Sequence, residues 1–248
     1  IWLATVVVSG ISYLSYLLKR YVFHESGTLV SGIIGGLYSS TATISVLARK
    51  SRKASELEAT DYVAAMLLAV SMMFLRFMIL ILIFSREIFL SIYPYLLTMA
   101  VVAAIVAWFI HSRQKRPEDQ PAETEEDDSS NPLEFKVALI FAVLFVIFTF
   151  LTHYTLVYAG TGGLNLLSFV SGFSDITTFI LNLLQNTGSV AALIITACSM
   201  QAIISNIMVN MFYALFFAGK GSKLRPWILG GFGVVITCNL VLLLFFYI

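Results

Sequence analysis

Eight runs of apolar residues, separated by short polar stretches, make up almost the whole chain. They cover residues 1–18, 28–48, 62–85, 87–111, 133–159, 164–184, 189–218 and 227–248. Most of the runs reach the roughly 20 residues that an α-helix needs to cross a bilayer, and none alternates apolar and polar residues as the strands of a membrane barrel do. The pattern therefore predicts an all-α, polytopic helical membrane protein.

The composition agrees with this prediction. Of the 248 residues, 59% are hydrophobic and 12% are charged, whereas about 25% are charged in a soluble domain. A net charge of +1 gives no reason to expect a nucleic-acid partner, so the lipid bilayer is the first partner that the sequence implies. Cys198 and Cys238 lie inside apolar runs, where we expect packing rather than a disulfide. Because the chain begins at Ile1 inside an apolar run, we expect a segment to precede it.

The polar stretch "HSRQKRPEDQPAETEEDDSSNP" divides the chain into two halves that resemble each other. We expect a disordered acidic linker at 112–132, between a first membrane repeat at 1–111 and a second at 133–248. "GGLYSSTATI" from Gly35 aligns with "SGFSDITTFI" from Ser171, and "VAAMLLAVSMM" from Val63 aligns with "VAALIITACSM" from Val190 with one skipped position. Internal symmetry of this kind is typical of transporter folds.

The positive residues test the topology. If all eight segments cross the membrane, the fourteen Lys and Arg residues outside the runs divide eight to six between the two sides. If the second and sixth segments are instead re-entrant or broken helices, thirteen of the fourteen fall on one side, which predicts that the basic loops and the linker are cytoplasmic. Each half then has three spans, so the repeats are inverted. A plain eight-span bundle stays the alternative.

Two glycine-rich and hydroxyl-rich segments and two isolated charges are the candidate site. Arg76 and Asp175 are the only charged residues well inside apolar runs, where a charge must face protein, water or a partner. Irregular backbone in a membrane is tolerated where it lines a cavity or is buried in protein. The predicted substrate-binding residues are Gly36, Ser39, Ser40, Thr41, Thr43, Arg76, Asp175, Thr177, Thr178 and Asn206, and the predicted gating or mouth residues are Asn131 and Glu134.

Each part of this site has a plainer structural explanation. Arg76 and Asp175 could form a structural ion pair, the hydroxyl groups could bond to their own helices, and Pro132 with Glu134 could simply start a helix. The polar stripe of Gln201, Ser205, Asn206 and Asn210 fits hydrogen bonding between helices as well as it fits a pore lining. Both anions and cations suit broken helices, and Asp175 is the only candidate metal ligand. No cofactor is predicted.

Enzyme signatures are missing from the sequence. An intramembrane aspartyl protease needs two membrane carboxylates and this chain has one, and there is no G-x-S-G motif with a partner histidine, no H-E-x-x-H motif and no phosphate-binding loop. We therefore expect no catalytic activity.

The segments "GTLVSGIIGGLYSSTATISVLARKS", "MMFLRFMI", "NPLEFKVALIFA", "SGFSDITTFILNL" and "SNIMVN" resemble, in order, the motifs of the C-terminal membrane domain of unknown function of MgtC/SapB-family bacterial proteins. The resemblance implies a bacterial inner-membrane protein, often preceded by an MgtC-like part, and a magnesium context. The sequence departs from the family where a second acid is common, at Ile176 and Thr177, and where a lysine is usual, at Asn210. The resemblance draws attention to Gly35, Gly36, Ser39, Ser40, Thr41, Arg76, Asn131, Pro132, Glu134, Asp175 and Asn206.

Two functional hypotheses follow. The first is a secondary transporter or channel-like permease for a small ion or polar solute, linked to magnesium or other cation homeostasis. The second is a non-transporting regulatory or scaffold module that binds another membrane protein. The substrate, the coupling ion, the direction of transport and the oligomeric state, including a homodimer, stay open.

Overall fold

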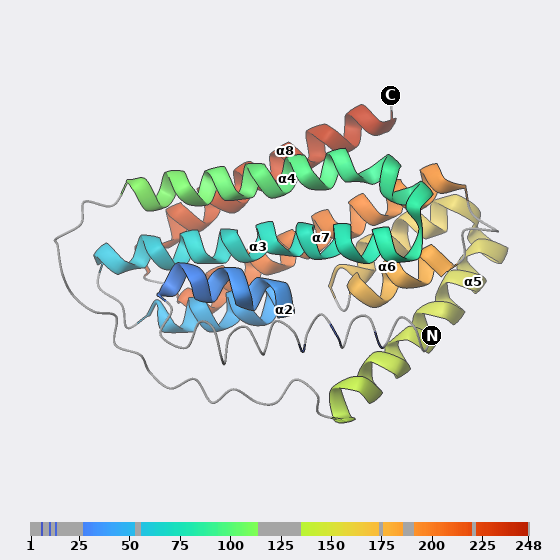
Figure 1. Ribbon diagram of the computed structural model, residues 1–248, viewed down its shortest axis with the longest axis horizontal. Coiled ribbons are helices and arrows are strands. Elements are labelled where there is room, and N and C mark those ends of the chain that lie inside the picture. Colours follow the sequence, from blue (N-terminus) through green and yellow to red (C-terminus); the bar gives the residue numbers. More distant parts are fainter. Residues whose placement is uncertain are drawn as a thin grey trace.

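The computed structural model describes residues 27–52, 56–113, 135–173, 176–185, 191–219 and 222–247, together with Val6, Gly10 and Tyr13. All regular secondary structure in these ranges is helical, which confirms the predicted fold class (Figure 1). The first predicted run and the linker lie almost entirely outside the described residues, so the predicted domain boundaries stay predictions. The seven described helices are α2 (Thr28–Lys50), α3 (Glu56–Phe84), α4 (Arg86–Ser112), α5 (Phe135–Ser171), α6 (Ile176–Gln185), α7 (Ala192–Ala218) and α8 (Arg225–Tyr247).

The predicted boundary between the fifth and sixth runs differs from the structure. Residues 160–163 include three glycines, yet α5 continues through them for a total length of 37 residues. A glycine costs about 1 kcal/mol in a helix, but backbone groups at membrane depth need internal hydrogen bonds, and continuing the helix supplies them. The sixth run is broken further on instead, between the end of α5 at Ser171 and the start of α6 at Ile176.

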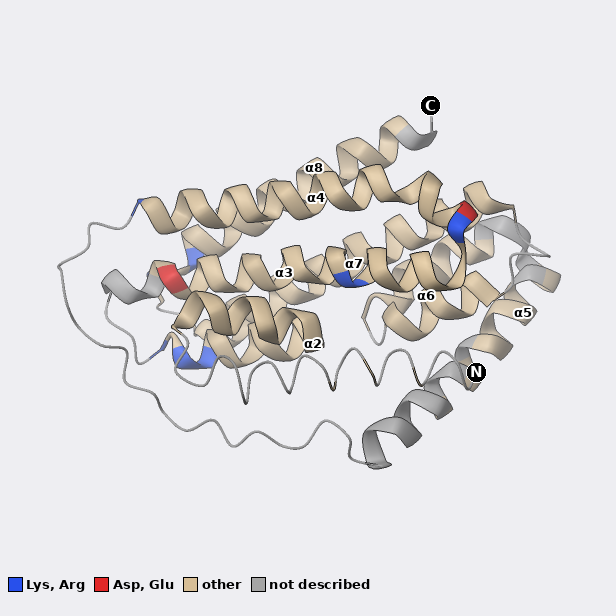
Figure 2. Cartoon of the chain, viewed as in Figure 1, with Lys and Arg blue, Asp and Glu red and all other residues tan. Residues whose placement is uncertain are grey.

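The described helices form a bundle that suits a bilayer. Five of them, α2, α3, α4, α7 and α8, are long and apolar enough to cross one. Large apolar side chains such as Trp108 (69% exposed) and Phe245 (74% exposed) face outward, where lipid would cover them. Figure 2 shows the charged residues of the described helices near helix ends, apart from one basic position midway along α3. The chain is therefore a multi-pass membrane protein in contact with lipid.

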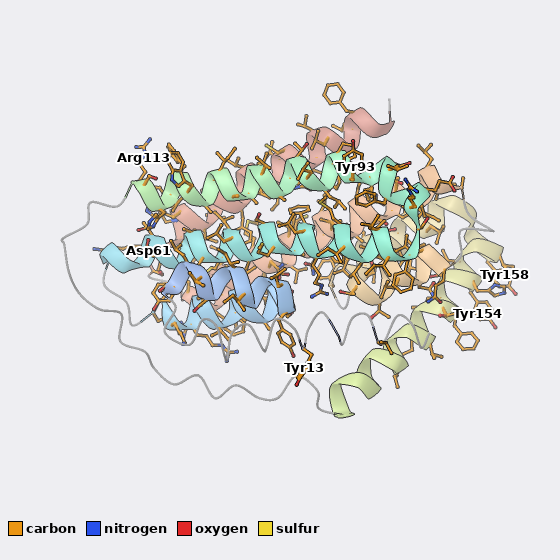
Figure 3. All side chains as sticks on the ribbon, in the orientation of Figure 1. Tyr13, Asp61, Tyr93, Arg113, Tyr154 and Tyr158 are labelled. Atoms are coloured by element: carbon orange, nitrogen blue, oxygen red, sulfur yellow. The ribbon has the colours of Figure 1, made fainter. Side chains whose placement is uncertain are left out.

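One end of the bundle carries an ion pair between α3 and α4. Asp61 Oδ1 lies 2.6 Å from His111 Nδ1, and both side chains are about a quarter exposed. Figure 3 places Asp61 and Arg113 at this end, where α3 begins and α4 ends. The pair agrees with the expectation that polar residues near the ends of the apolar runs lie at the membrane interface.

Helix α2 does not run straight through the bilayer, because it doubles back at Ser39. The backbone there is extended (φ −157°, ψ 109°), and a Cβ built on Gly35 would lie 2.5 Å from Thr43 Oγ1. In a continuous helix these two residues would be about 12 Å apart along the axis. The two halves lie side by side (Figure 1), and each is too short for a bilayer about 30 Å thick. The predicted break in the second segment is confirmed.

The first half of α2 packs against α3 without clearance. A Cβ on Gly32 would lie 2.3 Å from the carbonyl oxygen of Ala65, and one on Gly36 would lie 2.5 Å from the Cα of Ala69. Gly32 and Gly36 are four residues apart, as are Ala65 and Ala69, so one row of small residues faces another. Such rows allow membrane helices to approach to backbone contact, where dispersion forces are strongest. The hairpin is thereby held against α3.

Helices α3 and α7 form the centre of the bundle. Helix α3 contacts α2, α4, α6 and α8, and α7 contacts α2, α4, α5, α6 and α8. Helix α6 has only ten residues, and all but the last are buried. Because α6 is surrounded by protein, its ends can lie inside the bundle without exposing backbone to lipid.

Replacing Gly36 with alanine tests the close packing of α2 on α3. We expect Gly36→Ala to lower the free energy of unfolding by about 1–3 kcal/mol, because the new methyl group meets the α3 backbone, which cannot move aside as a side chain would. Unfolding in detergent micelles by titration with a denaturing detergent measures this change. Gly233→Ala is the matched control, since nothing lies within 4 Å of a Cβ built there. Equal stability of the two variants would contradict the packing argument.

Candidate functional site

Arg76 joins the two hydroxyl-rich segments. Its Nη1 donates to the carbonyl oxygen of Tyr38 at 2.6 Å, and its Nη2 donates to Thr177 Oγ1. Tyr38 ends the first half of α2, and Thr177 lies in the first turn of α6. The carbonyl end of a helix carries partial negative charge, so a guanidinium there is stabilised where an isolated charge would be costly. The prediction that Arg76 lies at the meeting point of these segments is confirmed for the residues that the structure describes.

Ser39 begins the second half of α2. Its backbone is outside the helical region, and its Oγ accepts a hydrogen bond from the backbone N–H of Ala42 at 3.3 Å. A serine that accepts from the third residue beyond it is an N-cap, which satisfies one of the amides that a helix start leaves without a partner. The break therefore exposes two opposite helix ends, one served by Arg76 and the other by Ser39.

The other predicted residues of this segment contact protein. Gly36 packs on α3, and Thr43 packs against Gly35 across the hairpin. The Thr41 carbonyl accepts from Ser45 Oγ at 2.8 Å, which is the back-bonding common for hydroxyls in membrane helices. Ser40 is buried, at 7% exposure. Gly36 and Thr43 thus shape the hairpin.

The second segment is described in part. Thr177 and Thr178 are buried at the start of α6, with 3% and 0% exposure. Asp175, the residue before α6, lies outside the described residues, as do the predicted mouth residues Asn131 and Glu134. The predicted approach of Asp175 to Arg76 and its role as a candidate metal ligand stay predictions.

Helix α7 supplies polar side chains to the end of α5. Asn206 Nδ2 donates to the carbonyl oxygen of Gly172 at 3.1 Å, and Ser205 Oγ donates to that of Phe169 at 2.7 Å. Asn210 Nδ2 donates in turn to Asn206 Oδ1 at 3.1 Å. The last carbonyls of a helix have no partner within it, so these side chains satisfy part of the break after α5. Of the two readings left open for the polar stripe, hydrogen bonding between helices holds for Ser205 and Asn206.

Arg52 was not among the predicted site residues, although it links the end of α2 to the end of α7. Its Nε donates to the carbonyl oxygen of Phe217, and its Nη2 donates to that of Phe216 at 3.2 Å. Arg49 adds its guanidinium carbon 4.2 Å from the centre of the Phe217 ring. The last turn of α7 has no basic residue of its own, so these arginines supply the positive charge that a helix end favours. In the sequence they served only as a topology signal.

The two breaks have the same spacing from the helix that supports them. Gly36 is 33 residues before its contact Ala69, and Gly172 is 33 residues before its contact Ser205. Both separations correspond to an offset of 136 residues, the offset of the alignment of Gly35 with Ser171. The alignment of Val63 with Val190 has an offset of 127 and is therefore displaced by nine residues from these contacts.

Described helices that break or end inside an apolar bundle, around one arginine, define a polytopic membrane protein with a polar centre. The chain belongs to the family described as "Domain of unknown function (DUF4010)", whose model matches residues 6–218. An uncharacterized protein of Aquifex aeolicus (strain VF5) is 25% identical over 227 residues, which are 89% of this chain and 96% of that relative. No solved structure matches the chain. The expected membership of a family of unknown function is confirmed, while the link to MgtC/SapB proteins stays a prediction.

Replacing Arg76 tests its role as the link between the segments. We expect Arg76→Ala to lower the free energy of unfolding by about 1.5–3 kcal/mol, the range for a lost hydrogen bond to a charged group. Arg76→Lys should recover less than half of the loss, because one ammonium cannot hold two acceptors in the planar geometry of a guanidinium. Denaturing-detergent titration is again the measurement.

Arg113→Ala is the matched control for this prediction. Arg113 is exposed at the end of α4, so its loss should change the free energy of unfolding by less than about 0.5 kcal/mol. If Arg76→Lys were as stable as the natural chain, the bridging geometry would not matter and the structural role assigned to Arg76 would be wrong.

Proposed function

We propose that the chain is a secondary transporter or channel-like permease for a small ion or polar solute. The observation that carries this proposal is the position of Arg76, whose guanidinium binds the carbonyl end of one broken helix and a hydroxyl at the start of another. Helix ends and a charge at membrane depth are costly unless protein or a solute satisfies them, and transporters use such broken helices to bind their substrates. The site would act by binding and releasing the solute, without catalysis.

We further propose that the two halves are inverted repeats. Two observations support this: the equal spacing of Gly36 and Gly172 from their contacts, and the exchange of partners in which α2 contacts α7 and α6 contacts α3. In Figure 1 α2 and α6 lie toward opposite ends of the bundle, as hairpins entering from opposite faces of a membrane would. Movement of one repeat against the other could then open the site to each side in turn.

The membrane and its orientation are part of the proposal. The resemblance to MgtC/SapB-family proteins favours a bacterial inner membrane and a role in magnesium or other cation homeostasis. The basic residues after α2, Arg49 and Arg52 among them, favour a cytoplasmic position for that end of α2, and the acidic linker would lie on the same side.

One observation favours the second candidate, a regulatory or scaffold module. Protein groups from both segments already hold the Arg76 guanidinium, as they would in a structural core that never opens. Flux separates the two functions, since a module that only binds another membrane protein moves no solute.

Flux into proteoliposomes tests transport. With a panel of alkali and divalent cations, protons, carboxylates and neutral solutes, we expect the natural chain to move at least one solute faster than empty liposomes do. Arg76→Ala should lower that flux at least tenfold. Thr177→Val, which loses only the hydroxyl that accepts from Arg76, should lower it by about ten- to a hundredfold if a charge-assisted bond worth about 1.5–3 kcal/mol acts in transport.

Thr196→Val is the control, because the Thr196 hydroxyl bonds only within its own helix, to the carbonyl oxygen of Ala192 at 2.9 Å. It should transport like the natural chain. No flux of any solute above empty liposomes, with the protein folded and inserted, would exclude the transporter and leave the scaffold module.

A further inference from the structure

Asn210 contains a buried oxygen without a hydrogen-bond partner. Three buried polar side-chain atoms lack a partner in the described part of the chain: Thr152 Oγ1, Gln201 Oε1 and Asn210 Oδ1. Thr152 lies on α5, away from the two breaks, and Gln201 lies nine residues from Asn210, on the opposite side of α7. Asn210 is fully buried, at 0% exposure, and its side chain is bound to the polar relay at the end of α5. Its oxygen therefore needs an explanation of its own.

The orientation of the Asn210 amide follows from the relay. The Gly172 carbonyl can only accept a hydrogen bond, so Asn206 must turn its Nδ2 toward it. Asn206 then presents its Oδ1 to Asn210, which must answer with its own Nδ2. The nitrogen and oxygen of an amide are often hard to tell apart, but here the chain of donors decides between them. The atom left over on Asn210 is the acceptor.

This oxygen lies between the two breaks. Asn206 is level with the end of α5, and Asn210 is one helical turn further along α7, about 6 Å beyond that end. The second half of α2 and the end of α7 run toward the same contact, made by Arg49 and Phe217. Counted back from this contact, Asn210 is about 10 Å along α7 and Ser40 is about 14 Å along α2, so the two residues are at similar depth.

We propose that Asn210 Oδ1 binds an electropositive group of the solute, in the simplest case an alkali cation or an ammonium ion. A buried amide oxygen without a donor is unfavourable in an apolar surrounding, and a cation or an N–H donor removes that cost. An anion at the same atom would be repelled. Identifying this ligand with the transported solute rests on the proposed function, whereas binding itself does not.

Thermal unfolding of the purified protein in detergent tests this site. The melting temperature is measured in sodium, potassium and ammonium chloride, with choline chloride at equal ionic strength as the reference. A ligand that binds only the folded state raises the melting temperature in a saturable manner. We expect at least one small cation to do so relative to choline, and we expect Asn210→Leu to lose the rise, with Asn210→Ala in its place if the leucine variant does not fold.

Asn239→Leu is the matched control. Asn239 is also fully buried, but its Oδ1 accepts from Tyr95 and its Nδ2 donates to the Val235 carbonyl. This variant should have a lower melting temperature in every salt and should keep the cation-dependent rise. The Asn210 variants should lose the rise without a comparable drop in choline, since they remove an oxygen that has no partner.

Two outcomes would overturn the inference: no small cation raises the melting temperature above choline, as expected if only water occupies the site, or an Asn210 variant keeps the rise. The result is independent of transport. A rise that depends on Asn210, together with no flux, would sustain the binding site and refute the transporter. Flux with a rise that Asn210→Leu leaves unchanged would do the reverse.

Discussion

The hydrogen bond from Arg76 to the Tyr38 carbonyl is the interaction on which the centre of this protein depends. Doubling α2 back at Ser39 interrupts its backbone ladder inside an apolar bundle, where no bulk water can satisfy the freed groups. A carbonyl at a helix end and a cation each carry a high desolvation cost alone, and each offsets that of the other when they meet. The break and the buried charge are therefore two halves of one solution.

Contacts within each half of the chain differ in kind from contacts between the halves. Gly32 and Gly36 bring the α2 backbone against α3, and Gly172 brings the end of α5 against α7, at distances that leave no room for a methyl group. Across the halves, polar contacts are made by Arg52, Arg76 and Tyr95. Close backbone packing resists displacement, whereas hydrogen bonds can exchange partners. This division suits a protein whose halves move as units, as the proposed transport requires.

Much of the candidate site could be predicted because charge and backbone-breaking residues are rare in apolar runs. Arg76 is conspicuous for its cost in lipid, and Ser39 lies among small hydroxyl residues that favour helix caps. The individual roles could not be predicted. Thr43 packs and the Thr41 carbonyl accepts a back-bond, although both residues fit the pattern that singled out Ser39. A hydroxyl bonds to whatever its rotamer reaches, and only the neighbouring helix determines that.

Sequence alone determined the all-α class, the membrane location, the break in α2 and the importance of Arg76, because helix length, hydropathy and the cost of a charge are local properties. Tertiary structure decided the contacts of Arg52 with the end of α7, the buried acceptor on Asn210 and the nine-residue correction to the alignment of the halves. These depend on which turn of one helix lies beside which turn of another. Apolar sequences match one another in several registers, and only the fit of small side chains at backbone contact selects one of them.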